Sequence, residues 1–262
     1  MPTPHLEGFL TAARNDPQAT LLALDIDGTV SAIAASPDAA TVGPEMRATL
    51  ERLAARYHLW FLSGRDADVA RRLVGVERAG YVGSHGLEAL DAEGLRPLAV
   101  VGGLRAHLDE LTRAVVAALP QLAPFVERKR WSVAFHFRSL PESSDAPDRL
   151  RRLLDAALPP GLRAQSGKRV VEVGPAAEHS KGGAMLWLLD RLQPRRVLAA
   201  GDDLTDVTTF EALASRPGVD ALRIAVRQAG ETPAELLAAA DMAVNGVEEL
   251  HRRVLAPLAG ER

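Results

Sequence analysis

The chain has 262 residues, 47% of them hydrophobic, and its 31 Lys and Arg against 34 Asp and Glu give a formal net charge of −3. The length accommodates one large α/β domain or a domain with an inserted module. The slightly negative charge argues against a general nucleic-acid-binding protein, and the absence of cysteine excludes disulfide bonds, thiolate metal sites and a cysteine nucleophile.

Short apolar runs alternate with helical periodicity in the first and last parts of the chain. The runs are 21–24, 59–62, 81–82, 197–200, 222–226 and 242–244, and the helical segments include 44–56 and 182–192. This alternation predicts parallel strands joined by helices, an α/β fold. No run approaches the ~20 residues of a transmembrane helix, and residues 1–20 lack the pattern of a signal peptide. We therefore expect a cytoplasmic protein without a membrane partner.

The middle of the chain has a different pattern. Helical spacing over 102–119 and 147–158 alternates with pairs of strand-like segments at 125–129 and 131–138, then at 162–165 and 169–173. Helix, hairpin, helix, hairpin is an α+β pattern inserted in an α/β frame. We therefore expect a core built from residues 1–101 and 176–262, with a separate domain over residues 102–175.

The first chemical motif is Asp25-Ile26-Asp27-Gly28-Thr29, directly after the apolar run 21–24. A carboxylate such as Asp25 can attack a phosphoryl group and form an aspartyl-phosphate. Asp27 projects to the same side of an extended chain and can protonate the leaving oxygen, then activate water. Taken alone, the motif is also compatible with a turn-rich loop or a calcium-binding loop.

The second motif is Ser63-Gly64-Arg65, after the apolar run that ends at Leu62. A serine at a strand end can donate to a phosphoryl oxygen, or it can cap the next helix. Both roles are compatible, because a helix N-terminus also attracts phosphate. Arg65 either anchors this loop or contacts a phosphorylated substrate.

The third motif is Lys181, at the start of a predicted helix with Ser180 as its expected N-cap. An ammonium group here would offset the charge of the nucleophile and of the transferring phosphoryl group. The alternative is a solvated surface lysine.

The fourth motif is Gly201-Asp202-Asp203-Leu204-Thr205-Asp206, after the run 197–200. Clustered carboxylates repel one another unless a cation is bound, and Mg²⁺ prefers oxygen ligands. We expect Mg²⁺ to bind the carboxylates of Asp25 and Asp202 and the backbone carbonyl of Asp27. Asp203 and Asp206 are expected behind these ligands, with Asp203 orienting Lys181 or a metal-bound water. An Asp-rich turn that caps a helix is the alternative.

The order of these four motifs resembles that of the haloacid dehalogenase superfamily of aspartate-nucleophile phosphatases. The match comprises D-x-D-G-T at 25–29, S-G-R at 63–65, the lysine at 181 and G-D-D-x-T-D at 201–206. The resemblance implies a Rossmann-like parallel-sheet core with Asp25 and Asp27 as catalytic residues, and with Ser63, Gly64 and Lys181 binding phosphate. The insertion between serine and lysine resembles the superfamily's C2B cap domain.

Further segments resemble the trehalose-6-phosphate phosphatase family, namely 83–88, 127–129, 133–138 and 171–175. In that family a Glu-x-Lys pair and a glutamate on the last cap strand bind sugar hydroxyls. The resemblance implies these roles for Glu127, Lys129 and Glu172, and we assign Arg65 and Arg138 to substrate binding as well. The alternative for Glu127 and Lys129 is a surface ion pair, worth ~0–1 kcal/mol.

Three positions depart from the family pattern. Val207 follows the aspartate motif where the family usually has glutamate, Ser180 replaces a common asparagine, and Gly174 stands where Arg or Lys is common. The role of the segment 207–209 is not indicated by the sequence, and neither is the oligomeric state.

The motifs predict a Mg²⁺-dependent phosphatase that works through an aspartyl-phosphate, and the family resemblance implies trehalose 6-phosphate as its substrate. The closest alternative is the same chemistry on sucrose phosphate, a glucosylglycerate phosphate or a hexose phosphate. A phospho-accepting signalling receiver also combines aspartates, Mg²⁺ and lysine, but its acceptor follows the third strand and it has no insertion. A non-catalytic sugar-phosphate-binding protein is the remaining alternative.

Overall fold

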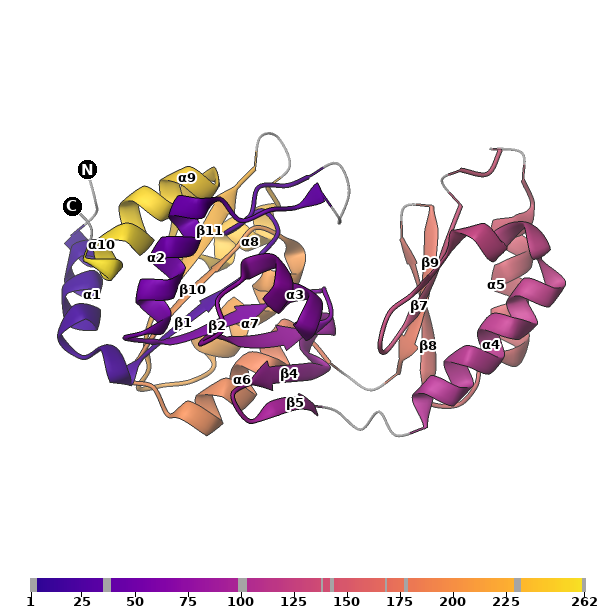
Figure 1. Ribbon diagram of the computed structural model, residues 1–262, viewed down its shortest axis with the longest axis horizontal. Helices are drawn as coiled ribbons and strands as arrows, with labels where there is room; N and C mark the ends of the chain where they lie inside the picture. The colour runs from indigo at the N-terminus through magenta and orange to yellow at the C-terminus, as the bar shows by residue number, and fades with distance from the viewer. Residues whose placement is uncertain are drawn as a thin grey trace. The chain divides into compact units, whose positions relative to one another are not determined.

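The computed structural model describes residues 4–34, 39–98, 103–137, 139–141, 144–167, 169–176, 179–228 and 232–260. The chain divides into two compact units, one made of residues 1–98 and 179–262 and the other of residues 99–178 (Figure 1). The second unit thus begins at 99 and ends at 178, close to the 102 and 175 expected from the sequence.

The first unit contains an eight-stranded sheet in the order β12-β11-β10-β1-β2-β3-β4-β5. The strands from β12 to β3 are parallel to their neighbours, whereas β4 and β5 are antiparallel. Their bounds are β1 Thr20–Leu24, β2 His58–Leu62, β3 Gly80–Gly83, β4 Glu88–Asp91, β5 Gly94–Pro97, β10 Arg196–Gly201, β11 Asp220–Arg227 and β12 Met242–Asn245.

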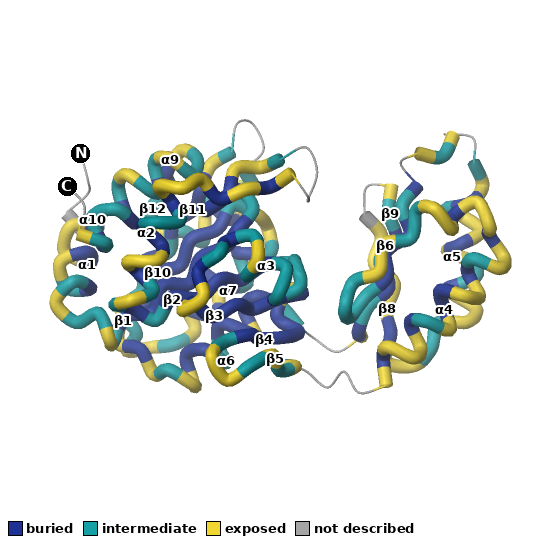
Figure 2. Tube along the Cα trace, in the orientation of Figure 1, coloured by how far each residue is buried: buried dark blue, intermediate teal, exposed yellow. Residues whose placement is uncertain are grey.

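Helices cover both faces of this sheet, because the strands are apolar on both sides. Leu22 and Leu24 of β1 belong to one apolar cluster, and Leu21 and Ala23 belong to another. The first cluster includes side chains of α1 Pro4–Asn15, α2 Pro44–Ala54, α3 Ala67–Val74, α9 Gly246–Leu250, η5 His251–Leu255 and α10 Ala256–Ala259. The second includes α6 Lys181–Leu192, α7 Leu204–Ala214 and α8 Ala234–Ala239. Figure 2 shows the central strands β1, β2, β3 and β10 as largely buried.

The mainly parallel α/β fold predicted from the sequence is confirmed, and each predicted apolar run lies in a strand. The hairpin of β4 and β5 was not predicted. Its strands are four residues each and carry polar residues such as Glu88, Asp91 and Arg96, so they lack an apolar run.

The second unit has a four-stranded antiparallel sheet in the order β6-β7-β9-β8. The elements are α4 Leu104–Ala118, η4 Pro120–Phe125, β6 Val126–Arg128, β7 Val133–His136, α5 Ala146–Ala157, β8 Leu162–Gly167 and β9 Val170–Pro175. Within this unit α4 and α5 lie along one face of the sheet (Figure 1). Val133, Phe135, Val171 and Val173 are buried, whereas Glu172, between the last two, keeps partial exposure, because successive side chains of a strand point to opposite faces.

In the part of the chain that the structure describes, none of the helices combines the length and apolarity needed to cross a bilayer.

Candidate active site

The register of the central strands brings three of the predicted motifs to one edge of the sheet. Leu24 of β1 lies beside Ala200 of β10 and Phe61 of β2. Asp25, Ser63 and Asp202 follow within two residues of these partners, at the carboxyl ends of parallel strands. In open α/β sheets, ligands bind at this edge.

Lys181 connects two of the carboxylates. Its Nζ atom lies 2.6 Å from Oδ1 of Asp25 and 2.7 Å from Oδ1 of Asp206. All three side chains are at least nine-tenths buried. The predicted alternative of a solvated surface lysine is therefore wrong, because a charge with this little exposure requires ionic partners.

Burial and these contacts shift the pKa values of the pair. Burial raises the pKa of Asp25, the Lys181 ammonium opposes that rise, and the neighbouring charge of Asp206 adds to it. Burial alone would lower the pKa of Lys181, but the charges of Asp206 and Asp25 outweigh it and raise the pKa above its ordinary value. Lys181 is thus held in its charged form.

Asp206 is fixed on both of its oxygens. While Oδ1 accepts from Lys181, Oδ2 accepts from the backbone N–H groups of Asp202 and Asp203, each at 3.2 Å. Gly201 allows this contact, because a Cβ atom at position 201 would lie 2.2 Å from the Asp206 carboxyl carbon.

Of the two roles expected for Asp203, the orientation of Lys181 is wrong, and the orientation of a metal-bound water stays a prediction. The Asp203 side chain caps α7 by accepting from the backbone N–H of Leu204 at 2.7 Å, and it forms a capping box with Asp206. The lysine is oriented by Asp206 instead, since the cap draws the Asp203 carboxylate toward the helix terminus.

Asp25, Asp202 and Asp206 each present a carboxylate oxygen within 4.8 Å of the others. Three carboxylates against the one ammonium of Lys181 leave a formal charge of −2 in a mostly buried site. Burial, together with the charge of Asp206, raises the pKa of Asp202 to about 7. This oxygen-rich, electron-rich set is suited to a hard divalent cation. The set contains both carboxylates of the predicted ligand pair, Asp25 and Asp202. It also contains Asp206, which was expected behind the ligands rather than among them.

The Asp27 carboxylate is bound by Arg65. Arg65 donates from Nε to Oδ2 at 2.7 Å and from Nη2 to Oδ1 at 2.8 Å. The Asp27 side chain keeps 40% exposure, whereas that of Arg65 is 16% exposed. Asp27 is thus the more accessible carboxylate of its motif, held in one orientation by a two-point contact.

Ser63 is buried, and its hydroxyl accepts from the backbone N–H of Arg65 at 3.1 Å. The next helix, α3, has Asp66 at its N-cap position, so the alternative role of Ser63 as that cap is wrong. The turn bends Ser63, Gly64 and Arg65 around the end of β2.

The start of α6 is held by two local contacts. The Ser180 hydroxyl accepts from the backbone N–H of Gly183 at 3.0 Å, which confirms the predicted N-cap. The backbone N–H of Gly182 donates to the hydroxyl of Thr208 at 3.0 Å. A Cβ atom at position 182 would lie 2.4 Å from the Thr208 carbonyl oxygen. The segment 207–209, whose role the sequence did not indicate, thus packs α7 against the helix that carries Lys181.

In the second unit, the predicted sugar-binding side chains form two separate polar pairs. Lys129 Nζ lies 3.0 Å from Oε2 of Glu172, which also accepts from the Ser132 hydroxyl through Oε1. Glu127 is 2.9 Å from Nε2 of His136. Glu127 and Lys129 do not pair with each other, but each takes part in a partly exposed pair with a residue of a neighbouring strand, as the alternative of a surface ion pair predicted. Arg138 lies outside the described residues.

Two parts of the site were given no role from the sequence, although the segment 83–88 was noted for its resemblance to the family. Gln228, after β11, donates from Nε2 to the backbone carbonyl of Gly28 at 2.6 Å. The turn of Ser84, His85 and Gly86, after β3, contacts the Ser63 loop. The sequence did indicate where these segments lie, because both follow apolar runs. They are therefore expected at the same edge of the sheet as Asp25.

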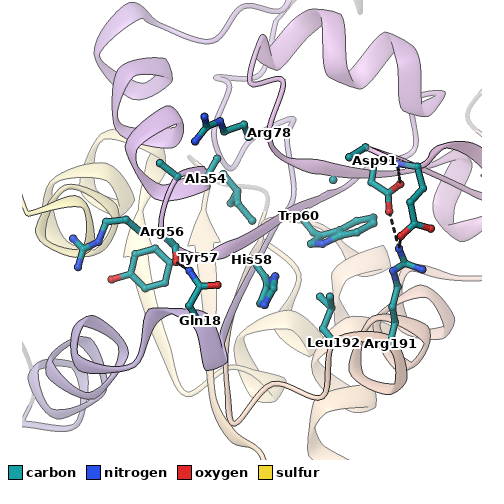
Figure 3. A pocket seen from close by; sticks show the side chains of 15 residues that line it. Gln18, Ala54, Arg56, Tyr57, His58, Trp60, Arg78, Asp91, Arg191 and Leu192 are labelled. Carbon is teal, nitrogen blue, oxygen red and sulfur yellow. Dashed lines mark hydrogen bonds and ion pairs between the residues drawn. The ribbon is translucent and has the colours of Figure 1, made fainter.

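A separate cavity of about 370 Å³ lies among the residues that begin β2 and β3 and end β4. Figure 3 shows Trp60 and His58 at its wall and Arg191 paired with Asp91. The cavity contains none of the predicted site residues.

Residues 23–238 match the sequence model of the Trehalose_PPase family, described as trehalose-phosphatase. A trehalose-phosphate phosphatase of Mycobacterium tuberculosis is 36% identical over 203 residues, which is 72% of this chain and 50% of that protein. The chain thus spans about half the length of the curated relatives it matches.

Solved structures share the fold. The C-terminal domain of Candida albicans trehalose-6-phosphate phosphatase aligns with a TM-score of 0.70 at 21% identity, covering 99% of this chain and 98% of that one. The Aspergillus fumigatus trehalose-6-phosphate phosphatase aligns with a TM-score of 0.66 at 22% identity, covering 100% of both chains.

Proposed function

Since this chain belongs to the trehalose-phosphatase family, we propose that it is a Mg²⁺-dependent phosphatase that hydrolyses trehalose 6-phosphate to trehalose and inorganic phosphate. The observation that supports this most strongly is the buried contact between Lys181 and Asp25, 2.6 Å long, at the carboxyl end of β1. This contact pairs a cation with a carboxylate at the position where a phosphoryl-accepting nucleophile is needed. A signalling receiver is disfavoured, because the acceptor here follows the first strand and the chain has a second unit.

The first step forms an aspartyl-phosphate. A carboxylate oxygen of Asp25 attacks phosphorus, and the bond between phosphorus and the sugar oxygen breaks. The electron pair goes to that sugar oxygen, which receives a proton from Asp27. In this structure both Asp27 oxygens accept from Arg65, so Asp27 takes up a proton and releases one of these contacts before it donates that proton.

The charge that develops on the phosphoryl oxygens is offset by Lys181, with Ser63 and the backbone of Gly64 as neighbouring donors. Mg²⁺ would be held by Asp25 and Asp202, with Asp206 beside them. When bound, it supplies positive charge that lets an anionic carboxylate approach an anionic phosphate ester.

The second step hydrolyses the acyl-phosphate. Asp27, now a carboxylate, accepts a proton from water, and the water oxygen attacks phosphorus. The bond between phosphorus and Asp25 breaks, which restores the Asp25 carboxylate and releases phosphate.

The polar residues of the second unit are proposed to select the sugar. Glu127, Lys129 and Glu172 are charged side chains on or next to β6 and β9 and keep partial exposure. Charged groups form strong, directional hydrogen bonds to hydroxyls, and a disaccharide offers many of them. Arg138 stays a prediction from the sequence.

The experiment that tests this function is phosphate release from a panel of sugar phosphates, with Mg²⁺ and with a chelator. The panel contains trehalose 6-phosphate, sucrose phosphate, glucosylglycerate phosphate and glucose 6-phosphate. We expect the highest kcat/KM on trehalose 6-phosphate and loss of turnover with the chelator. A preference for another member would overturn the substrate but retain the chemistry, and absence of phosphate release from all of them would overturn the function.

A further inference from the structure

The turn after β3 has an unusual backbone. Ser84 and His85 both have left-handed conformations, with φ of 50° and 55°, and Gly86 follows with φ of 103°. Residues other than glycine rarely adopt this region, and two in succession are unfavourable unless surrounding contacts enforce them. Such residues cluster at functional sites.

The contacts that enforce this backbone come from the Ser63 loop, residues 63–66, which follows β2. The Ser84 N–H donates to the Arg65 carbonyl at 2.8 Å, and the His85 N–H donates to the Ser63 carbonyl at 3.0 Å. The Ser84 hydroxyl donates to Asp66 at 2.8 Å. The turn is therefore tied to the Ser63 loop by both main chain and side chain.

The same turn also packs against the start of α6, the helix that begins at Lys181. A Cβ atom at Gly86 would lie 2.3 Å from the carbonyl oxygen of Ser180, the residue that precedes Lys181. The turn thus fits closely between two loops that carry proposed phosphate-binding residues.

The side chain of His85 lies between the Ser63 loop and solvent. Its ring packs on Gly64, since a Cβ atom at position 64 would lie 2.5 Å from the imidazole Nε2. His85 is nevertheless an exposed residue. An exposed imidazole with an enforced backbone conformation is therefore held directly against the Ser63 loop.

The order of the strands indicates what this ring can reach. His85 follows β3, which is separated from the nucleophile's strand β1 by β2. Neighbouring strands are ~4.8 Å apart, so the two strands are about 10 Å apart. Ser63 follows the intervening strand β2 and is therefore closer to a phosphoryl group on Asp25, whereas His85 lies one strand further away.

We propose that His85 is a substrate-contacting residue that hydrogen-bonds a hydroxyl of the sugar ring that carries the phosphate. This inference rests on the proposed function. An imidazole nitrogen can donate to or accept from a hydroxyl group, and one such contact is sufficient for this role. His85 would add a sugar contact from the first unit to the selection proposed for the second.

The test compares His85→Asn and His85→Gly with the wild type on trehalose 6-phosphate and on p-nitrophenyl phosphate, which has no sugar hydroxyls. Asn and Gly both tolerate the left-handed backbone, so the turn is preserved. We expect kcat/KM for trehalose 6-phosphate to fall about tenfold, the effect of one lost hydrogen bond, with p-nitrophenyl phosphate changed less than about twofold. His107→Asn, on the exposed side of α4, is the matched control and should match the wild type on both esters.

An unchanged kcat/KM for trehalose 6-phosphate, or an equal loss on both esters, would overturn the role of His85. A wild type that prefers another sugar phosphate overturns the proposed substrate alone, and the same comparison is then made on that sugar phosphate. A wild type that cleaves only p-nitrophenyl phosphate overturns both proposals.

Discussion

Arg65 holds both carboxylate oxygens of Asp27, through Nε at 2.7 Å and Nη2 at 2.8 Å. Its own main chain is fixed by the Ser63 hydroxyl and the Ser84 N–H. Arg65 therefore connects the proposed phosphate-binding loop to the proposed acid/base. The sequence left two roles open for Arg65, a loop anchor or a contact to the phosphorylated substrate, and this geometry adds a third, the orientation of Asp27.

Replacing Arg65 with lysine separates orientation from substrate binding. Lysine keeps the charge but cannot form the planar two-point contact, so Asp27 loses its fixed orientation. We expect kcat to fall about tenfold, with KM for trehalose 6-phosphate changed less than about threefold. Arg72→Lys, in an exposed ion pair with Asp68, is the matched control. A raised KM at unchanged kcat would instead assign Arg65 to substrate binding.

Gln228 is expected to position the motif that carries the nucleophile. Its amide donates to the Gly28 carbonyl at 2.6 Å, while the Gly28 N–H donates to the Ser31 carbonyl at 2.7 Å. Gln228→Met keeps the length of the side chain but removes the donor, so we expect kcat to fall about tenfold from the loss of one hydrogen bond. KM and the melting temperature should stay close to those of the wild type. A variant with wild-type kcat would contradict this role.

The acidic cluster predicts a pH-dependent effect of Mg²⁺ on stability. The pKa of Asp202 rises in the folded chain from its ordinary 3.8 to about 7. The metal-free folded state therefore binds a proton that the unfolded state has released, and this group's contribution to stability falls as the pH rises through that window. Mg²⁺ needs the ionised carboxylate. We expect Mg²⁺ to raise the melting temperature more at about pH 8 than at about pH 5.5.

The quantity compared is the difference in melting temperature between metal-loaded and metal-free protein at each pH. The contributions of ionisable groups remote from the cluster therefore cancel. Asp202→Asn should abolish the Mg²⁺ effect. Asp203→Asn is the matched control, because asparagine also caps a helix, and it should keep the effect. An equal increase in melting temperature at both pH values would argue against binding at this cluster.

Glu172 is expected to contribute to sugar recognition rather than to the chemistry. Its carboxylate accepts from Lys129 and Ser132 within the second unit. Glu172→Ala should raise KM for trehalose 6-phosphate about tenfold or more, because it removes a charged acceptor for hydroxyls. KM for p-nitrophenyl phosphate should be unchanged. The matched control is Asp148→Asn, in an exposed ion pair with Arg151 of α5. Equal effects of Glu172→Ala on both esters would refute the role.

The α/β frame was predictable because its signals are local. Buried parallel strands give continuous apolar runs such as Leu21–Leu24, and the polar residues that follow them lie at one edge of the sheet. Asp25, Ser63 and Asp202 could therefore be placed together without a structure. The hairpin of β4 and β5 has no apolar run, so it was missed.

The pairing of side chains was not predictable to the same degree. Asp203 and Asp206 are both acidic and three residues apart, and only the capping geometry of α7 decides which one faces Lys181. Likewise, the β7–β9 pairing brings Lys129 to Glu172 rather than to Glu127. The contact of Gln228 with Gly28 joins residues 200 positions apart; the apolar run before Gln228 indicates the sheet edge at which it lies, but not the partner of its amide.

The central claim is that Asp25 accepts the phosphoryl group, and phosphate release by Asp25→Asn tests it most directly. The amide cannot act as the nucleophile, so we expect phosphate release from trehalose 6-phosphate with saturating Mg²⁺ to fall at least about 10³-fold. The variant should stay folded by circular dichroism, and Asp203→Asn, the control with the same chemical change, should stay active. Turnover by Asp25→Asn within about tenfold of the wild type would contradict the account.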